Sequence, residues 1–228
     1  MLAETPEQKR TEMIGGESDR LARFGLLLVG LLAELMLAPL FGTSEAGLQA
    51  GRAVAVLLLL VALWSVGAQR SAFLLFVPAL IVQLIVFRVH VGIIPITAAV
   101  MRLLFFGYVT FAIVRHIVRQ PEVTMDMIAA AACAYLLLGL DWAHLYILLE
   151  YVHPGSFDIP ASFLVGRDAS AALMYFSFTT LTTVGYGDIH PTEVGAGGIA
   201  VAEAVVGQLY LAIMIARMVA LHIARRAG

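Results

Sequence analysis

The amino-acid sequence predicts an all-α membrane protein with six membrane-spanning helices and one shorter, re-entrant helix. The chain has 228 residues, of which 61% are hydrophobic and only 13% are charged. Its mean hydropathy is +0.93. A soluble domain could not cover so much apolar surface with polar side chains. The apolar residues also fall in blocks of about 17–30 residues, the length that a helix needs to cross about 30 Å of hydrocarbon.

Seven apolar runs define the expected helices, and glycine, proline or arginine residues separate them. Six runs are interpreted as spanning helices: Phe24–Phe41, Ala53–Ala68, Ala72–Phe87, Ile93–Val118, Thr124–Val152 and Val194–Ala224. The remaining run, Ala169–Thr182, has about 14 residues and is too short to cross the membrane. We interpret it as a re-entrant half-helix, which enters the membrane and leaves it on the same side.

The distribution of lysine and arginine predicts the orientation in the membrane. With a cytoplasmic N-terminus and six alternating helices, the inside receives Lys9, Arg10, Arg20, Arg23, Arg70, Arg115, Arg119, Arg225 and Arg226. The outside receives only Arg52, Arg88 and Arg167. The positive-inside rule favours this orientation. We therefore expect a multi-pass protein of the cell membrane, with residues 1–20 as a cytoplasmic tail, both termini in the cytoplasm and the loop 153–191 outside.

A glycine-containing motif follows the half-helix, where residues 180–188 read T-L-T-T-V-G-Y-G-D. Non-helical backbone inside a membrane is tolerated only where it is buried in protein or lines a cavity. Gly185 and Gly187 alternate with larger residues, and glycine adopts positive φ without steric cost. Alternating backbone hands would turn successive carbonyl groups to the same side. Four such segments would form stacked rings of oxygen atoms, with a further ring from the Thr183 hydroxyl, and this cage suits a dehydrated monovalent cation.

This nine-residue motif resembles the signature of the potassium-channel pore family, and the resemblance extends over roughly residues 123–224. It implies an outer helix, a pore helix, a selectivity filter and an inner helix, which we assign to residues 121–228. It also implies a homotetrameric pore that conducts potassium passively and is not an enzyme. The ions would bind along Thr183, Val184, Gly185, Tyr186 and Gly187, with potassium coordinated at the first four of these.

The expected partners are three further copies of the chain and membrane lipid. The net charge of −2 suggests no nucleic-acid partner. The resemblance implies permeant potassium ions and no organic cofactor. Because the sequence stops at Gly228, a few residues after the last apolar run, we expect no soluble ligand-binding domain.

Residues around the motif are expected to support the filter. The C-terminal end of the half-helix would point toward the membrane centre, where the negative end of its dipole favours a cation. The family often has a tryptophan near Phe176 and a carboxylate near Thr179, as partners for the filter tyrosine and aspartate, but this chain has neither. The candidate supporting residues are Thr182, Asp188, Thr179, Phe176, Glu150 and Glu203.

Two of these candidates are acidic and lie on the long helices. Glu150 precedes a Pro-Gly turn, as in the family, and we expect it to tie the end of the outer helix to the turret or the pore-helix region. The alternative is a solvated interfacial carboxylate. Glu203 lies inside the last apolar run, where a charge is expensive. It is expected to face the back of the pore helix and meet threonine or tyrosine hydroxyls, and ion contact is the alternative.

Other polar or small residues inside the long runs allow two interpretations each. Gly207 lies where the family keeps its hinge glycine, and a glycine inside a helix indicates either bending or close packing. Asp141 and His144 could form a proton-sensitive cluster or, as we prefer, hydrogen-bond between helices.

The front half, residues 21–120, resembles a voltage-sensor domain in helix number and topology but lacks its charge ladder. Arg102 is the only basic residue deep in the fourth run, and Glu34 is the only acidic partner offered by the first three. Because two isolated charges inside a membrane are costly, we expect Glu34 and Arg102 to form a buried pair. We therefore expect weak voltage dependence or none.

Three other functions were weighed against a potassium channel. A potassium uptake transporter usually carries four degenerate filter loops in one chain, whereas this chain has one intact motif. An intramembrane enzyme using His144, Asp141 or His153 would need a nucleophile or a metal motif beside them, and the sequence pairs them with neither. A non-selective cation channel usually has a changed filter residue near Tyr186, and none is changed here.

Overall fold

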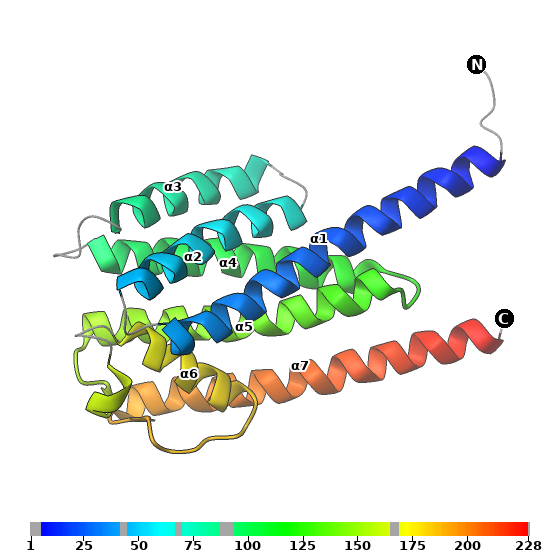
Figure 1. Ribbon diagram of the computed structural model, residues 1–228. Coiled ribbons are helices and arrows are strands. Elements are labelled where there is room, and N and C mark those ends of the chain that lie inside the picture. The colour runs from blue at the N-terminus through cyan, green and yellow to red at the C-terminus, as the bar shows by residue number, and fades with distance from the viewer. Residues whose placement is uncertain (1–5, 42–44, 67–69, 87–93, 165–168, 228) are drawn as a thin grey trace.

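The computed structural model describes residues 6–41, 45–66, 70–86, 94–164 and 169–227 and is built almost entirely of helices. The helices are α1 (Pro6–Phe41), α2 (Glu45–Ser65), α3 (Arg70–Val86), α4 (Ile94–Arg119), α5 (Met125–Val152), α6 (Ser170–Leu181) and α7 (Val194–Ala227). Two short strands, β1 (Phe157–Asp158) and β2 (His190–Pro191), and one 3-10 turn (Ala161–Phe163) complete the described elements. The predicted all-helical fold is confirmed (Figure 1).

Three of the described helices are long and apolar enough to cross a membrane. They are α4, α5 and the part of α7 from Val194 to Ala224. The apolar parts of α2 and α3, Ala53–Ser65 and Ala72–Ile85, are shorter than a full span. The first expected run continues without a break into the polar segment before it, because α1 already begins at Pro6. Six spans therefore remain a prediction, and three are supported by length and composition within the described residues.

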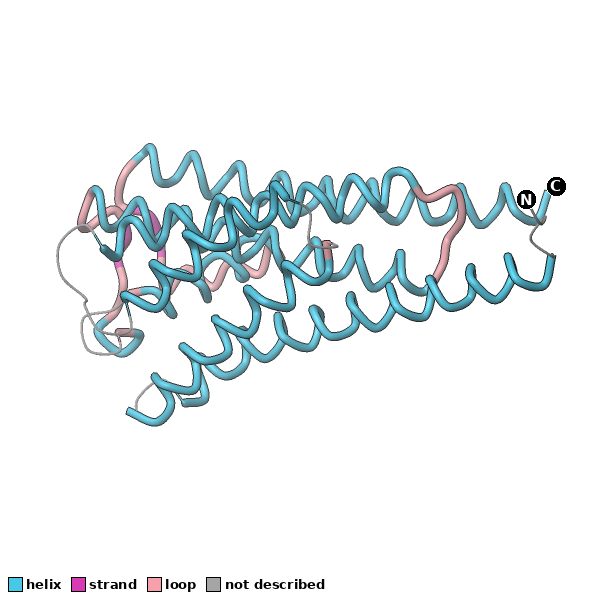
Figure 2. The backbone as a smooth tube through the Cα atoms, turned by 90° about the horizontal axis from the view of Figure 1, so that it is seen from above, coloured by secondary structure: helices cyan, strands magenta, loops and turns pink. Residues whose placement is uncertain are grey.

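The long helices lie side by side in a bundle (Figures 1 and 2). Helix α1 packs against α2 and α5, and α4 packs against α3 and α5. The largest side chains of the shared core are fully or almost fully buried and come from four helices: Leu27, Leu31, Leu59, Phe105, Ile113 and Leu137. The helix pair α4 and α5 thus joins the front helices to the rest of the chain.

The short helix α6 is only 12 residues long and lies between α5 and α7. After α6 the chain returns to the end of the bundle from which α6 began, and α7 starts there (Figure 1). Strand β1 precedes α6 and pairs with β2, which precedes α7, through Phe157 opposite Pro191 and Asp158 opposite His190. The half-helix is therefore re-entrant within the bundle.

The opposite end of the bundle holds the beginning of α1 and the end of α7 (Figures 1 and 2). At this end α4 stops before Pro121, and α5 starts with Thr124 as N-cap, whose hydroxyl accepts a hydrogen bond from Met127 N at 3.4 Å. The buried carboxylate of Asp126 lies 3.6 Å from Arg20 Nε and 3.8 Å from His116 Nε2. This cluster joins α1, α4 and α5 at this end of the bundle.

Candidate functional site

In the loop that follows α6, residues 182–188, residues with a positive backbone φ angle alternate with residues whose φ is not positive. Thr183, Gly185 and Gly187 have φ angles of 61°, 53° and 78°. Val184 and Tyr186, between them, do not have positive φ. Positive φ costs glycine nothing, so Gly185 and Gly187 are suited to their positions. The positive φ of Thr183, which a non-glycine residue rarely adopts, was not predicted from the sequence.

The amide groups of this loop point back to the C-terminal end of α6. Val184 N and Gly185 N both donate to Thr179 O, at 2.9 Å and 3.1 Å, and Thr183 N donates to Thr180 O at 2.9 Å. All described peptide bonds are trans. In a planar trans peptide the carbonyl of the preceding residue points opposite to the N–H. The carbonyl oxygens of residues 182, 183 and 184 therefore point away from α6, in the same general direction.

The side of the loop that faces away from α6 is open in a single subunit. Residues 182–187 are all exposed, and the side chains of Val184 and Tyr186 have 53% and 71% of their surface accessible. One chain thus offers a single wall of carbonyl groups, which could contribute ligands to a cation but could not enclose one.

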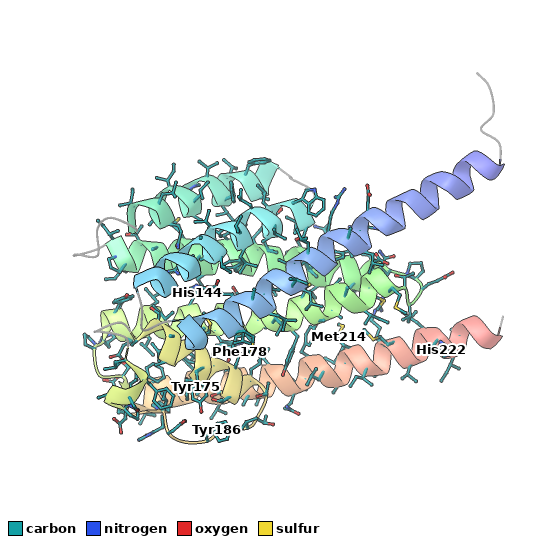
Figure 3. All side chains as sticks on the ribbon, viewed as in Figure 1. His144, Tyr175, Phe178, Tyr186, Met214 and His222 are labelled. Atoms are coloured by element: carbon teal, nitrogen blue, oxygen red, sulfur yellow. The ribbon has the colours of Figure 1, made fainter. Side chains whose placement is uncertain are left out.

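Tyr175 on α6 contacts the C-terminal end of the loop. Its hydroxyl donates to Asp188 Oδ2 at 2.8 Å, and its ring is parallel to that of Tyr186, with 6.3 Å between centroids and 1° between planes (Figure 3). The second carboxylate oxygen of Asp188 accepts from Ile189 N at 3.0 Å. The resemblance implies that the aromatic side chains of this half-helix, Tyr175 among them, brace the loop, but the hydrogen bond from Tyr175 to Asp188 was not predicted from the sequence. The available signal was a tyrosine, with both a ring and a hydroxyl, in the half-helix beside the motif.

The other candidates on α6 support the helix more than the loop. The Phe176 ring is buried, and its centroid lies 5.1 Å from that of Tyr146 and 5.3 Å from that of Phe157. The hydroxyl groups of Thr179 and Thr182 donate to Phe176 O and Phe178 O, at 2.9 Å and 2.6 Å. It is the backbone carbonyl of Thr179, not its side chain, that accepts the amides of the loop.

Glu150, in the last turn of α5, organises the turn that follows. Its two carboxylate oxygens accept hydrogen bonds from Gly155 N at 2.8 Å and Phe157 N at 3.3 Å. Gly155 has a φ of 89°, which glycine adopts without strain. Thr192 then joins this turn to the segment after the motif, because its hydroxyl donates to Gly155 O at 2.5 Å. Glu150 therefore connects the end of α5 to the chain on both sides of α6.

Glu203 on α7 lies behind α6 and is fully buried. Tyr146 Oη on α5 donates to Glu203 Oε2 at 2.5 Å. Ser177 Oγ on α6 lies 2.5 Å from Glu203 Oε1 and 2.7 Å from Gly139 O. The carboxyl group thus bridges three helices, through one tyrosine and one serine hydroxyl.

Gly207, one turn further along α7, is in close contact with the end of α6. A Cβ atom at this position would lie 2.5 Å from Leu181 O and 2.8 Å from Leu181 Cδ1. Tyr135 Oη also donates to Leu181 O, at 3.3 Å. In this conformation the glycine permits close packing of α7 on α6, which is one of the two interpretations of this residue.

The polar residues of the α1, α4 and α5 interface have several partners. Arg102 lies within electrostatic range of both Glu34 and His144, and its Nε donates to Ala98 O at 3.4 Å. Glu34 Oε2 is buried without a hydrogen-bond partner. Asp141 Oδ2 accepts from Thr110 Oγ1 at 2.8 Å, which links α5 to α4. The direct Glu34–Arg102 contact therefore stays a prediction.

His144 has partners other than Asp141. Its Nδ1 lies 2.7 Å from Leu140 O, and its ring stacks on Phe106 of α4, with 5.8 Å between centroids and 22° between planes. Asp141 and His144 thus each connect α5 with α4, by a hydrogen bond and by ring stacking, instead of acting on one another.

Comparison with known proteins gives one family model and one relative. Residues 130–223 match a family model described as "Ion channel". Protein LctB of Bacillus caldotenax is 33% identical over 101 residues, which is 43% of this chain and 74% of LctB. No solved structure matches significantly. The matched residues include most of α5, all of α6 with its loop, and most of α7, whereas α1 to α4 lie outside the family match.

Proposed function

The chain belongs to the ion channel family, and from this premise we propose that it is one subunit of a potassium-selective channel in which four copies surround a single pore. Ion channels conduct passively, so the protein is a membrane transporter of ions and not an enzyme. The loop 182–188 is proposed as the selectivity filter, α5 as the outer helix, α6 as the pore helix and α7 as the inner helix.

The observation that carries the proposal is the backbone of the filter loop. Alternating φ signs at Thr183, Gly185 and Gly187 accompany amides that turn toward Thr179 O and carbonyls that turn away from it. In potassium channels, four T-V-G-Y-G loops present rings of carbonyl oxygens that replace the hydration shell of the ion. The same five residues form the loop here, at positions 183–187. We propose that they coordinate potassium, with the oxygens of Thr183 to Tyr186 as ligands.

A homotetramer is proposed because one subunit supplies only one wall of the filter. Closed rotational symmetry completes a ring of identical walls. The inner helix supports this arrangement, since a long series of its apolar side chains is exposed in the single subunit: Val201, Val205, Leu209, Ile213, Ile215 and Val219. In a membrane such a face is covered by lipid, by neighbouring copies or by both. A complete ring of carbonyl groups around a cation requires neighbouring copies.

We propose that the front helices, α1 to α4, form a peripheral domain that crosses the membrane four times. We also propose that both termini of the chain lie in the cytoplasm. The first residues of α1 and the last of α7 lie at the same end of the bundle, which is the arrangement expected of an even number of crossings (Figure 1). This end is opposite to the filter loop. The front helices are proposed to respond weakly to voltage, because Arg102 is the only basic residue deep in α4.

Ion flux into vesicles containing the purified protein tests the proposal. We expect uptake of potassium, or of its analogue rubidium, that sodium does not match. Gly185→Ala should abolish this selectivity or the flux itself, because an added Cβ is strained at a φ of 53° and alters the carbonyl wall. Gly195→Ala is the matched control, since its Cβ would meet nothing within 4 Å and its φ is not positive. Equal sodium and potassium flux through the unaltered protein would favour a non-selective cation channel.

A further inference from the structure

We propose that Glu203 carries a proton and, as a neutral carboxylic acid, positions the pore helix by donating a hydrogen bond to Ser177. The protonation state rests on the hydrogen-bond geometry around the carboxyl group. Its consequence for ion conduction rests on the proposed function, because it assumes that the loop after α6 is the filter. The two parts are tested separately below.

Three short contacts connect oxygen atoms around Glu203. Tyr146 Oη lies 2.5 Å from Glu203 Oε2, Ser177 Oγ lies 2.5 Å from Glu203 Oε1, and the same Ser177 Oγ lies 2.7 Å from Gly139 O. Each contact is far shorter than two oxygen atoms would adopt without a proton between them. Three protons are therefore needed, one for each contact.

The hydroxyl groups can supply only two of these protons. Tyr146 and Ser177 each have a single O–H, and the carbonyl of Gly139 can only accept. An ionised carboxylate also only accepts, which would leave either the Ser177–Glu203 or the Ser177–Gly139 contact without a proton. A protonated Glu203 completes the series: Tyr146 donates to Glu203 Oε2, Glu203 Oε1–H donates to Ser177, and Ser177 donates to Gly139 O.

The surroundings of the carboxyl group agree with a neutral acid. Glu203, Tyr146 and Ser177 are all fully buried. An isolated carboxylate taken out of water is costly unless a cation compensates it, and a carboxyl group without one tends to stay protonated. Glu203 takes part in none of the ion pairs found among the described residues. The titratable groups that face it among the described residues are two of the tyrosines of α5, Tyr146 by hydrogen bond and Tyr135 within electrostatic range. Neither supplies a positive charge.

The chain of hydrogen bonds fixes the part of α6 on which the filter is built. Ser177 lies two residues before Thr179, whose carbonyl accepts the amides of Val184 and Gly185. On the same helix Phe178 lies directly over Gly139, where a Cβ would come within 2.7 Å of its ring. A displacement of Ser177 away from α5 would therefore move Thr179 and the amides that depend on it. In this way the hydrogen bonds of the protonated acid couple the position of the filter to the positions of α5 and α7.

Loss of the proton has a defined direction of effect. Raising the pH until Glu203 ionises would leave Ser177 with two acceptors and one proton, and would leave a buried negative charge without a cation. We therefore expect sustained conduction to decline at alkaline pH, and a variant that cannot ionise to resist this decline. Acidification should not have this effect, because the group is already protonated.

The protonation state is tested by infrared difference spectroscopy on the purified tetramer at neutral pH. The carbonyl stretch of a protonated carboxylic acid should be present in the unaltered protein and absent from Glu203→Gln. Glu193→Gln is the matched control, because Glu193 is exposed beside the start of α7 and should leave the band unchanged. A carbonyl-stretch spectrum that is the same in the unaltered protein and in Glu203→Gln would overturn the assignment of the proton whatever the channel conducts.

The positioning role is tested by potassium flux through three variants. Glutamine resembles the neutral acid, since its carbonyl can accept from Tyr146 and its amide can donate to Ser177. Glu203→Gln should conduct like the unaltered channel, with less decline at alkaline pH. Glu203→Ala and Ser177→Ala should lower sustained flux by about tenfold, as expected when one partner of a buried hydrogen bond is removed. Intact tetramers are confirmed by native mass spectrometry, so that misfolding is not mistaken for lost positioning.

The outcomes distinguish the two proposals. Loss of flux in Glu203→Gln, with tetramers intact, would mean that the negative charge itself is needed and would contradict the neutral acid. Normal sustained flux in Glu203→Ala would contradict the positioning role. Failure of the unaltered protein to select potassium would contradict the proposed function, yet the infrared band of Glu203 would still decide the protonation state.

Discussion

Gly207 on α7 contacts the carbonyl oxygen of Leu181, the last residue of α6, without an intervening side chain. A Cβ at position 207 would lie 2.5 Å from that oxygen. The loop 182–188, which we propose as the filter, begins at the next residue, so the position of α7 sets the place from which the loop starts. Glu203, one turn earlier on α7, bridges to Ser177 and Tyr146, and the two contacts together attach α7 to the back of α6.

Gly207→Ala should destabilise the assembly by roughly 1–3 kcal/mol, because the added methyl group forces apart two closely packed backbones. Thermal unfolding of the purified protein in detergent measures the effect. Gly198→Ala, also on α7, is the control: its Cβ would meet nothing within 4 Å, and alanine is favoured over glycine in a helix by about 1 kcal/mol. Equal melting temperatures for the two variants would show that Gly207 is not needed for close packing.

Tyr175→Phe should shorten the time for which the filter stays conductive. The variant keeps the ring that stacks on Tyr186 but loses the hydrogen bond to Asp188, a contribution of about 1 kcal/mol. Sustained single-channel recordings at constant voltage measure the duration of conducting periods. A double-mutant cycle with Asp188→Asn gives the control, since the two changes should be clearly non-additive. Strictly additive effects would mean that the two side chains do not act through their shared hydrogen bond.

Arg217→Gln should loosen the contact between the inner helix and the end of α4. Arg217 Nη2 donates to the carbonyls of Ile117, Val118 and Gln120, at 3.3 Å, 2.8 Å and 2.8 Å. Carbonyls at a helix C-terminus have no partner within the helix and favour a cation, by up to about 2 kcal/mol in partly buried sites. Hydrogen exchange of the amides around residues 120–128 should therefore become faster.

Arg115→Gln serves as the control for that variant, because Arg115 is an exposed arginine on α4, the helix whose end Arg217 contacts. Its removal changes the net charge by the same amount and should leave the exchange rates near residues 120–128 unaltered. Similar acceleration in both variants would indicate a general effect of charge and not the loss of the Arg217 contacts.

The conductance–voltage relation of the channel should be shallow. One elementary charge that crosses the whole membrane field contributes about 2.3 kcal/mol per 100 mV, and steep sensors move three to four charges in each subunit. Even a full crossing by Arg102 in four subunits would supply only about 9 kcal/mol per 100 mV. Arg102→Gln should therefore affect folding or expression more than the slope. A steep relation that this variant flattens would identify the front helices as a voltage sensor.

The local features of the site were accessible from the sequence because they depend on short-range patterns. The 14-residue apolar run and the T-V-G-Y-G motif predicted a half-helix with a turned backbone behind it, and the structure has α6 at Ser170–Leu181 followed by positive φ at Gly185 and Gly187. Glycine alone marks such positions in a sequence. The positive φ of Thr183 carries no such mark, since it is imposed by the amide contacts to the end of α6.

Long-range partners could not be derived in the same way. The contact of Arg217 with the end of α4 depends on the packing of two helices far apart in the chain, and the contact of Tyr175 with Asp188 depends on how the loop folds back on α6. The expectation of six spans came from apolar runs, but the described apolar parts of α2 and α3 are shorter than a full crossing, and composition does not fix how such helices sit in a bilayer. Glu203 was traceable to the back of α6 because a buried acid needs hydroxyl or cationic partners, but the proposal that it carries a proton needed the three oxygen–oxygen distances of the structure.

The most direct test of the central claim is the reversal potential of a single reconstituted channel, with potassium on one side of a planar bilayer and sodium on the other. A filter built from the carbonyls of residues 183–187 predicts a reversal potential displaced far toward the potassium equilibrium potential, and the loss of this displacement in Gly185→Ala but not in Gly195→Ala. A reversal potential near zero for the unaltered channel would contradict potassium selectivity.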